Sequence, residues 1–371
     1  MDIFDIISLC GGLAFFLYGM HVLSSGLEKM TGGKLEAGLK KLTSNPVKSM
    51  ILGAGITAAI QSSSAVTVML VGLVNSGIMQ LEQTVGVIMG SNIGTTITAW
   101  IFSLAGIESS NVFVNLLKPE NFAPIIALVG IIFIMTKSTK RKHTGSVLVG
   151  FAVLMYGMTL MKDSVAPLKD SPVFAEVITM FNNPIFGILV GMVITGIIQG
   201  SAATVGILQA LSATGQITFG MAIPIIMGSN IGTCVTALIS TIGANKSAKR
   251  VSVVHVAFNV IGTVFCLPIF YLLHAIFQFD FVDGPVAEVG IAVVHTVFNV
   301  VTTFLLLPFR KFLVKIANFV IKDKEGAEEE YSLVDGLLVQ TPAIAVAECN
   351  RRVNEMAHIA QNTISVAMRL M

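Results

Sequence analysis

The chain has 371 residues, of which 54% are hydrophobic and 12% are charged, and its formal net charge is +2. The charged share is about half that of ordinary soluble proteins. This composition excludes a soluble globular domain, because so apolar a chain needs lipid to cover its surface; we expect a lipid bilayer around it and no nucleic acid among its partners.

The first predicted element is an apolar stretch that follows Asp2 and begins at residue 3. It has no basic segment before it and no small-residue cleavage pattern, so we expect a retained membrane span and not a signal peptide. Further along the chain the second apolar stretch is short for the ~20 residues that a helix needs to cross hydrocarbon. The intact spans are predicted at residues 3–25, 122–136, 145–166, 251–273 and 286–309.

Two helical hairpins are predicted, over residues 47–76 and 185–214, each made of two half-length apolar segments. The polar turn of the first reads Gln61-Ser62-Ser63-Ser64, and the turn of the second reads Gln199-Gly200-Ser201. A hairpin that re-enters the membrane is tolerated only where its free backbone groups face protein or a wet cavity. Each turn is therefore expected at a binding site or a pore.

Each hairpin is followed by an apolar segment with a polar, glycine-containing middle. Residues 80–105 contain Gly90-Ser91-Asn92-Ile93-Gly94-Thr95-Thr96, and residues 218–243 contain Gly228-Ser229-Asn230-Ile231-Gly232-Thr233. We expect two broken helices, and we interpret the four glycines as conformational and not as ligands.

The chain matches itself at an offset of 138 residues, without a slip from Gly12/Gly150 to Ala99/Ala237. One offset held this long, with small polar residues matching best, is typical of a transporter built from two copies of a membrane unit. We expect repeat unit one at 1–136 and repeat unit two at 137–309.

Basic residues gather in four segments: 29–48, 137–142, 246–250 and 310–315. All four should be cytoplasmic, and seven crossings with two hairpins place them on one side. The amino terminus is then outside and the carboxyl terminus is cytoplasmic. Three crossings separate the starts of the two units, so the repeats are inverted. The expected fold is an all-α polytopic protein of the cell inner (plasma) membrane.

A family resemblance rests on the two turns and on the Gly-Ser-Asn-Ile-Gly-Thr segments, each of which starts 29 positions after a glutamine. Over roughly residues 5–309 the chain closely resembles the sodium-dependent phosphate cotransporters, that is, the type II Na/phosphate cotransporters and their bacterial relatives. The resemblance implies a symporter of Na⁺ and inorganic phosphate. Animal members carry Gln-Ser-Ser-Ser in both repeats, whereas the second turn here reads Gln199-Gly200-Ser201-Ala202. This departure predicts a site weighted toward the first repeat.

The chemistry of the motifs supports both ligands. No Lys or Arg occurs from Ser49 to Leu117 or from Ser171 to Asn245, so helix amino termini, hydroxyls and amides must bind the oxyanion. A buried oxyanion without a counterion would cost many kcal/mol, so bound Na⁺ must supply positive charge. The expected phosphate-binding residues are Gln61, Ser62, Ser63, Ser64, Gln199, Gly200, Ser201 and Ala202. The expected Na⁺ site lies between turns and breaks, at Thr57, Gln61, Ser91, Asn92, Thr95, Thr195, Gln199, Ser229, Asn230 and Thr233.

Alternative functions stay open at this point. Na⁺ is favoured over H⁺ because neither turn and neither break contains Asp, Glu or His, which a proton relay needs. An H⁺-coupled carrier, a transporter or exporter of another oxyanion, and a non-transporting sensor or scaffold are the alternatives. An intramembrane enzyme with Ser63 as nucleophile is disfavoured because neither turn offers a base. We therefore expect no enzyme and no cofactor beyond Na⁺ as coupling ion, and we keep a homodimer as an open oligomeric state.

A shorter repeat follows downstream, in which His255, Asn259 and Thr263 recur 40 residues later as His295, Asn299 and Thr303. The spacing puts each trio on one helix face. We favour interhelical hydrogen bonds over a cavity lining or a pH-sensitive element. Residues 310–371 are expected to form a cytoplasmic linker and an amphipathic helix, either a simple tail or part of a domain similar to the phosphate-uptake regulator.

Overall fold

The computed structural model describes residues 2–31, 39, 45–106 and 118–322, together with scattered positions between 346 and 361. Within these described residues all regular elements are helices. The β-type pairing in the same residues is one isolated bridge between Thr218 and Pro285. The predicted all-α fold is confirmed. Lys34, Lys40, Lys41 and most of the tail helix expected over 333–371 lie outside the described residues.

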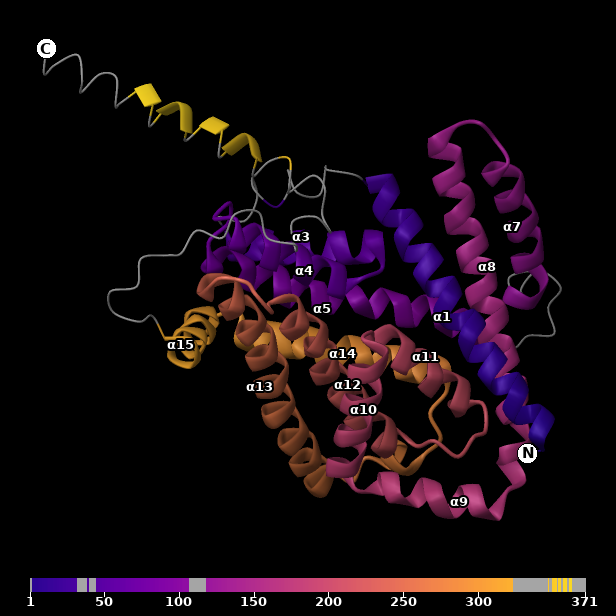
Figure 1. Cartoon of the computed structure of the whole chain (residues 1–371). Coiled ribbons are helices and arrows are strands. Elements are labelled where there is room, and N and C mark those ends of the chain that lie inside the picture. Colours follow the sequence, from indigo (N-terminus) through magenta and orange to yellow (C-terminus); the bar gives the residue numbers. More distant parts are fainter. Residues whose placement is uncertain are drawn as a thin grey trace, which may run out of the picture.

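The first half of the described chain begins with a long helix, α1, and ends with a long helix, α8, and the other helices of this half lie between these two in the sequence. In chain order the elements are α1 (Ile3–Thr31), α3 (Pro46–Ile60), α4 (Ser63–Asn75), α5 (Leu81–Ser103), η1 (Leu104–Gly106), α7 (Pro119–Ile134) and α8 (Thr139–Val165). Figure 1 shows α1, α7 and α8 on one side of α3, α4 and α5.

The second half repeats the pattern of two short helices followed by a long one and adds helices at its end. Its elements are η2 (Ala166–Asp170), α9 (Pro172–Ile178), η3 (Thr179–Asn182), α10 (Pro184–Ile198), α11 (Ser201–Ser212), α12 (Phe219–Ser240), α13 (Lys246–Phe277), η4 (Asp280–Asp283), α14 (Glu288–Leu306) and α15 (Arg310–Val320).

Several helices are long and apolar enough to cross a membrane, so the protein is a multi-pass membrane protein. Within the described residues these are Ile3–Thr31, Leu81–Gly106, Thr139–Asp170, Phe219–Ser240, Lys246–Phe277 and Glu288–Leu306. The predicted span at 122–136 corresponds to α7, whose 16 residues extend about 24 Å, short of a ~30 Å hydrocarbon core. The seven-crossing topology therefore depends on α7 and stays a prediction.

The short helices of the two predicted hairpins begin and end alike. The side chain of Asn45 caps α3 by accepting from the N–H of Val47 at 2.9 Å, and Asn183 caps α10 through Ile185 at 3.0 Å. A proline follows each asparagine at the first helical position, where its missing N–H costs nothing. A two-residue turn then leads into α4 or α11. The local structure of both copies is therefore set by residues at the same offset.

The prediction of two broken helices is wrong, because α5 and α12 run without interruption through Gly90–Thr96 and Gly228–Thr233. The glycines serve close packing instead. A Cβ on Gly90 would overlap the carbonyl oxygen of Met50 on α3, and a Cβ on Gly228 would overlap that of Ile188 on α10. Small residues let membrane helices approach backbone to backbone. These glycines therefore allow α3 to pack closely on α5 and α10 to pack closely on α12.

Helices α1 and α8 lie together with α7 on one side of the molecule (Figure 1), and α1 and α8 pack through glycines along their contact. A Cβ on Gly12 would lie 3.0 Å from the carbonyl oxygen of Gly157, and a Cβ on Gly19 would lie 2.7 Å from that of Gly150. Residue numbers therefore increase along α1 in the direction in which they decrease along α8, so the two helices are antiparallel. Gly12 and Gly150 are equivalents at the 138-residue offset, as are Gly19 and Gly157. The contact is thus reciprocal between the two copies.

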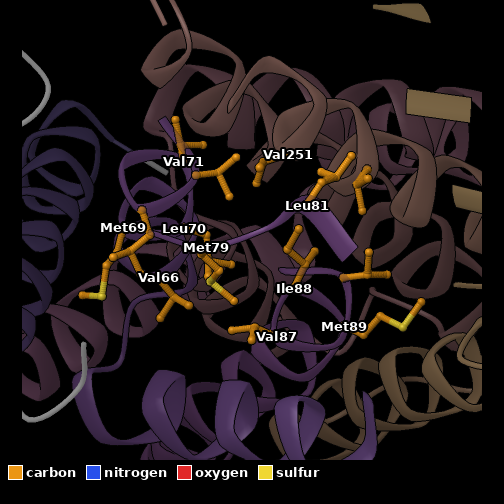
Figure 2. Packing of buried hydrophobic residues seen from close by; sticks show 14 of the residues in the cluster. Val66, Met69, Leu70, Val71, Met79, Leu81, Val87, Ile88, Met89 and Val251 are labelled. Carbon is orange, nitrogen blue, oxygen red and sulfur yellow. The ribbon is translucent and has the colours of Figure 1, made fainter. Parts of the chain in front are cut away.

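The largest apolar cluster holds α4 and α5 against α13 and α15. Figure 2 shows its packing; Val66 and Leu70 of α4, Ile88 of α5 and Val251 of α13 all belong to this cluster. A second cluster joins α1 to α5 through the rings of Phe16 and Phe102, whose centroids lie 5.1 Å apart. Together these clusters fix the long helices around the two polar turns.

Candidate functional site

Both turns place a glutamine in the left-handed backbone region. Gln61 has φ 56° and Gln199 has φ 63°, and the N–H of each donates to the carbonyl oxygen of the threonine four residues earlier, Thr57 or Thr195, at 2.7 Å. Glycine is preferred at such helix ends, because a side chain there costs roughly 1–2 kcal/mol. Retained strain of this kind is typical of functional positions.

The residue after each glutamine begins the second short helix, but only the first copy has a side-chain cap. The hydroxyl of Ser62 accepts from the N–H of Ala65 at 3.2 Å. Gly200, its equivalent, has no side chain to do the same. The amino terminus of α11 therefore leaves more backbone N–H groups for another acceptor than that of α4. Both helix ends carry partial positive charge suited to an anion.

The structure brings the two turns together. The hydroxyl of Ser64 donates to the carbonyl oxygen of Gln199 at 3.4 Å, across 135 residues of sequence. The equivalent of Ser64 is Ala202, which has no hydroxyl to make the reciprocal bond. The hydroxyl of Thr236 reaches the same oxygen at 3.4 Å. The phosphate-binding residues expected from sequence thus share one region, and the contact between them is one-sided.

The side chain of Gln61 links its own helix to α5. Its Nε2 donates to the carbonyl oxygen of Ala58 at 2.6 Å, and its Oε1 accepts from the hydroxyl of Thr98 at 3.0 Å. The hydroxyl of Ser24 on α1 donates to the backbone carbonyl of Gln61 at 3.3 Å. The first turn is therefore held by α1 and α5 at once.

The two buried threonines near the turns differ between the copies. The hydroxyls of Thr195 and Thr204 share a hydrogen bond of 2.7 Å. Thr57, the equivalent of Thr195, is fully buried, and its hydroxyl has no hydrogen-bond partner within the described part of the chain. The cause is Val66, which stands where the second copy has Thr204. A buried hydroxyl without a partner is costly, so Thr57 is available to a ligand.

In α5 and α12 the difference between the copies is reversed: the serine of the first copy has a hydrogen-bond partner, and the serine of the second copy has none in the described structure. The hydroxyl of Ser91 is bonded to the carbonyl oxygen of Ile88 at 2.9 Å, whereas that of Ser229 is buried and lacks a partner among the described residues. Thr95 and Thr233 both bond back within their own helices, at 2.9 and 3.1 Å. Among the motif residues of the two copies, the buried hydroxyls that lack a partner in the described structure are therefore those of Thr57 in the first copy and Ser229 in the second.

The asparagines of the long helices also differ. Asn230 donates from Nδ2 to Oδ1 of Asn299 at 2.8 Å, and its own Oδ1 lies 3.3 Å from Nε2 of His295. Asn92 donates to the carbonyl oxygen of Ile88 in its own helix at 3.1 Å, through its nitrogen and not its oxygen. Asn230 therefore ties α12 to α14, and the predicted interhelical hydrogen bonds are found there. Sequence reasoning assigned Asn230 to Na⁺ and missed that its amide is already paired on both sides.

One charged pair between the helices was also missed. Nζ of Lys162 on α8 lies 2.7 Å from Oε1 of Glu288 and donates to the carbonyl oxygen of Ala105 at 2.8 Å. The backbone carbonyl of Glu288 in turn accepts from Nε2 of Gln209 on α11 at 2.8 Å. Ionisable residues in apolar spans are rare and usually functional. Lys162 inside the apolar stretch 145–166 was the signal that could have revealed the pair.

Comparison with known proteins agrees with the repeated motifs. The family described as Na+/Pi-cotransporter matches residues 15–163 and again residues 153–282, one match for most of each repeat. The protein YqeW of Bacillus subtilis, described as uncharacterized, is 30% identical over 264 residues, covering 71% of this chain and 82% of YqeW.

Two further relatives have names that describe phosphate movement. "Putative inorganic phosphate export protein YjbB" of Escherichia coli K12 is 24% identical over 272 residues, covering 72% of this chain and 47% of that protein. "Sodium-dependent phosphate transport protein 2A" of Rattus norvegicus is 37% identical over 99 residues, covering 26% of this chain and 15% of its own length. No solved structure matches the chain. The chain therefore belongs to the Na+/Pi-cotransporter family, a family of phosphate transporters and not of enzymes.

Proposed function

We propose that the protein is a secondary transporter that couples Na⁺ to the movement of inorganic phosphate. The observation that carries this proposal is the meeting of two polar turns, together with two buried hydroxyls of the same motifs, Thr57 and Ser229, that have no partner among the described residues. Hydroxyl, amide and carbonyl oxygens suit Na⁺, and the amino termini of α4 and α11 suit an oxyanion. The name of the rat relative supports sodium dependence.

In the proposed site, phosphate binds between the two turns and Na⁺ binds where each turn meets its long helix. The first copy contributes more to Na⁺ binding than the second, because Thr57 is free where Thr195 is paired, and Asn230 is bound to α14. Ser229 is the expected contribution of the second copy. Na⁺ supplies the positive charge that no Lys or Arg in the two motif segments provides.

In the proposed topology the amino terminus is outside the inner membrane, the carboxyl terminus is cytoplasmic and the two repeats are inverted. The antiparallel packing of α1 and α8 through equivalent glycines supports the inversion. Alternating access then moves α3–α5 and α10–α12 as a core against α1, α7 and α8. A homodimer and re-entry of both hairpins into the membrane remain part of this proposal.

Transport in liposomes tests the coupling. Purified protein is reconstituted, and uptake of labelled phosphate is measured with an inward gradient of Na⁺, with the same gradient of choline, and with choline plus an inward proton gradient. We expect uptake with Na⁺ well above that with choline. Equal uptake with Na⁺ and with choline would contradict the proposal. Uptake stimulated by the proton gradient alone would identify H⁺ as the coupling ion.

The direction of transport is a separate question, because the YjbB relative is named for export. Proteoliposomes loaded with labelled phosphate and Na⁺ and diluted into choline should lose phosphate faster than those diluted into Na⁺. A carrier that runs in both directions under imposed gradients serves whichever direction the cell's gradients dictate. Efflux indifferent to Na⁺ would separate export from Na⁺ coupling.

A further inference from the structure

Helix α13 carries three buried polar side chains whose hydrogen-bonding capacity is unmet. His255, Asn259 and Thr263, here called the α13 stripe, follow one another at every fourth position and are at most 3% exposed. Within the described residues, both ring nitrogens of His255, Oδ1 of Asn259 and the hydroxyl of Thr263 lack a partner. A buried polar atom without a partner is destabilising, and native proteins keep few of them. A whole stripe of such atoms therefore calls for a physical reason.

The equivalent residues of α14, 40 positions later, each bond to another helix. Nε2 of His295 lies 3.3 Å from Oδ1 of Asn230, and Oδ1 of Asn299 accepts from Nδ2 of Asn230 at 2.8 Å. The hydroxyl of Thr303 donates to the carbonyl oxygen of Met89 on α5 at 3.4 Å. These three residues, here called the α14 stripe, therefore hold α12 at two points and α5 at a third.

The two stripes belong to helices that are packed in equivalent ways. Helix α14 runs antiparallel to α5, and α13 runs antiparallel to α12, because residue numbers rise along one helix of each pair as they fall along the other. The hydrogen bonds that show this are Met89–Thr303 and Trp100–Thr296 for the first pair, and Gly220–Tyr271 and Cys234–Asn259 for the second. Since α5 and α12 are equivalents at the 138-residue offset, α14 is to α5 what α13 is to α12.

Helices α13 and α14 meet at a residue and its own equivalent. A Cβ on Gly262 would overlap the side chain of Thr302, 40 residues later. A contact between equivalents lies on the axis that exchanges them. The same exchange swaps α5 with α12, since α13 and α14 each pack on both of these helices. The partners expected for the α13 stripe are therefore Asn92, the equivalent of Asn230, and the carbonyl oxygen of Met227, the equivalent of Met89.

Both expected partners lie on helices that touch α13, yet neither bonds to the stripe. Nδ2 of Asn92 donates within its own helix, to the carbonyl oxygen of Ile88 at 3.1 Å. Cys266 and Leu267, one turn beyond the stripe, pack against the apolar cluster that contains Met227. A movement of α5 and α12 relative to α13 is therefore what separates the stripe from these partners.

We propose that the α13 stripe is a second latch, which closes in the other conformation of the transport cycle. In the present conformation the α14 stripe holds Asn230 and Met89; in the other, the α13 stripe holds Asn92 and Met227 and the α14 stripe lets go. This inference rests on the proposed function, because it takes the two access states to exchange the conformations of inverted repeats. It also links the latch to Na⁺, since the side-chain oxygen of Asn92 can serve the ion only while α13 does not hold it.

Cross-linking tests the proposal and does not require transport. The reagent is dibromobimane, a small lipid-soluble compound that becomes fluorescent once it joins two thiols, and the background carries alanine in place of the four native cysteines. Asn92→Cys with Asn259→Cys reports the α13 latch, and Asn230→Cys with Asn299→Cys reports the α14 latch. The control is Asn230→Cys with His255→Cys. The Cys234–Asn259 contact places these two positions about 12 Å out of register along α12 and α13.

We expect both latch pairs to be joined, the α14 pair faster than the α13 pair, and the control to stay at background. Thr303→Val removes a bond of the present conformation, so it should raise the initial rate of the α13 pair about fivefold. Thr263→Val removes a bond of the other conformation and should lower the same rate by a similar factor. The two substitutions are matched in size and position, and only the two-latch arrangement gives them opposite effects.

The proposal is overturned if the α13 pair is joined no faster than the control, or if the two valine substitutions change its rate in the same direction. Should a variant with two asparagines replaced not fold, as judged by gel filtration, His255→Cys takes the place of Asn259→Cys. Failure of the proposed function has a different result. Cross-linking as expected, without Na⁺-dependent uptake by the parent protein, contradicts the coupling and leaves the two conformations; uptake without cross-linking of the α13 pair contradicts the latch alone.

Discussion

The buried hydroxyls of Thr195 and Thr204 lie 2.7 Å apart and share a hydrogen bond. In the first repeat the pair is broken by one substitution, because Val66 occupies the position equivalent to Thr204. Thr57 is thereby left buried with a free hydroxyl in the described structure. At this pair of positions, one methyl group in place of a hydroxyl thus distinguishes the first repeat from the second.

Val66→Thr should restore the missing pair and lower the affinity for Na⁺. The new hydroxyl would bond to Thr57 and compete with the ion, so we expect the Na⁺ concentration at half-maximal uptake to rise about tenfold, close to the worth of one hydrogen bond. Phosphate uptake into liposomes at graded Na⁺ measures it. Thr204→Val is the mirror-image control, since it frees Thr195 without touching Thr57. An unchanged Na⁺ dependence in Val66→Thr would remove Thr57 from the site.

Gln61→Ala and Asn92→Ala should each reduce Na⁺-dependent uptake about tenfold or more, and His255→Ala much less. Gln61 holds the first turn to α5 through Thr98, and Asn92 lies on the helix that packs beside that turn. His255 is buried on α13 and belongs to neither turn nor to the long helices that follow the turns. Rates are compared per amount of folded protein, as judged by gel filtration. Equal losses in all three variants would mean that the site has been misplaced.

Gln199→Gly should make the protein more stable while impairing transport. Glycine accepts the left-handed conformation of residue 199, so we expect a gain of about 0.5–1 kcal/mol together with loss of the amide from the turn. Gln278 has φ 47° at the end of α13, outside the turns. Gln278→Gly should therefore bring the same gain and leave uptake intact. Thermal unfolding in detergent and uptake are measured on both, and a loss of uptake in Gln278→Gly would contradict the assignment.

Gly90→Ala should destabilise the protein severely, by about 4 kcal/mol or more, because the added methyl overlaps the backbone of Met50. Gly55 on α3 has nothing within 4 Å of an added Cβ, so Gly55→Ala should be neutral or stabilising by up to about 1 kcal/mol. Melting temperatures of the two variants in one detergent provide the comparison. Similar melting temperatures would show that α3 and α5 do not pack as closely as described.

Lys162→Met should cost about 3–5 kcal/mol, because it leaves the carboxylate of Glu288 without its cation in a mostly buried place. Combining Lys162→Met with Glu288→Gln should recover most of the loss, since no unpaired charge remains. A double-mutant cycle of unfolding free energies measures the coupling. Additive effects of the two substitutions would argue against the ion pair.

Much of the helical framework follows from the sequence. Long apolar stretches predict α1, α8, α12, α13 and α14, and the 138-residue offset predicts two similar turns. Helix α9 was not predicted, since seven residues hold too little periodicity to reveal it. The chain also bends by 101° between residues 172–182 and α10; Asn183 and Pro184 indicate where the new helix begins, but not the angle between the two segments.

The glycines of α5 and α12 show why local rules fail here. Glycine lowers helix propensity, which suggests a break, but it also allows close approach between helices, which stabilises one. The four-residue spacing of Gly86, Gly90 and Gly94 favours packing, and it was visible in the sequence. Which role prevails depends on whether another backbone lies opposite, and α3 lies there.

The similarity of the two turns was predictable from the sequence, but the hydrogen-bond pairing of the residues around them was not. The sequence shows Val66 opposite Thr204 at the common offset, yet its effect appears only when Thr195 and Thr204 are found in contact. Asn230 likewise matches Asn92 in sequence, while its bonds to Asn299 and His295 come from α14, which lies beyond the stretch that matches at the 138-residue offset. The polar stripe of His295 and Asn299 predicts that they bond to another helix, but it does not reveal which residue they meet.

The glycine contact between α1 and α8 has the form of an isologous interface, in which residue i of one copy meets j of the other and j meets i. Gly12 meets Gly157, and Gly150 meets Gly19. A single unit bearing Gly12 and Gly19 would thus offer a second copy of itself the surface that α8 now offers α1. Joining two such units into one chain would have required no new contact here, only a connecting segment.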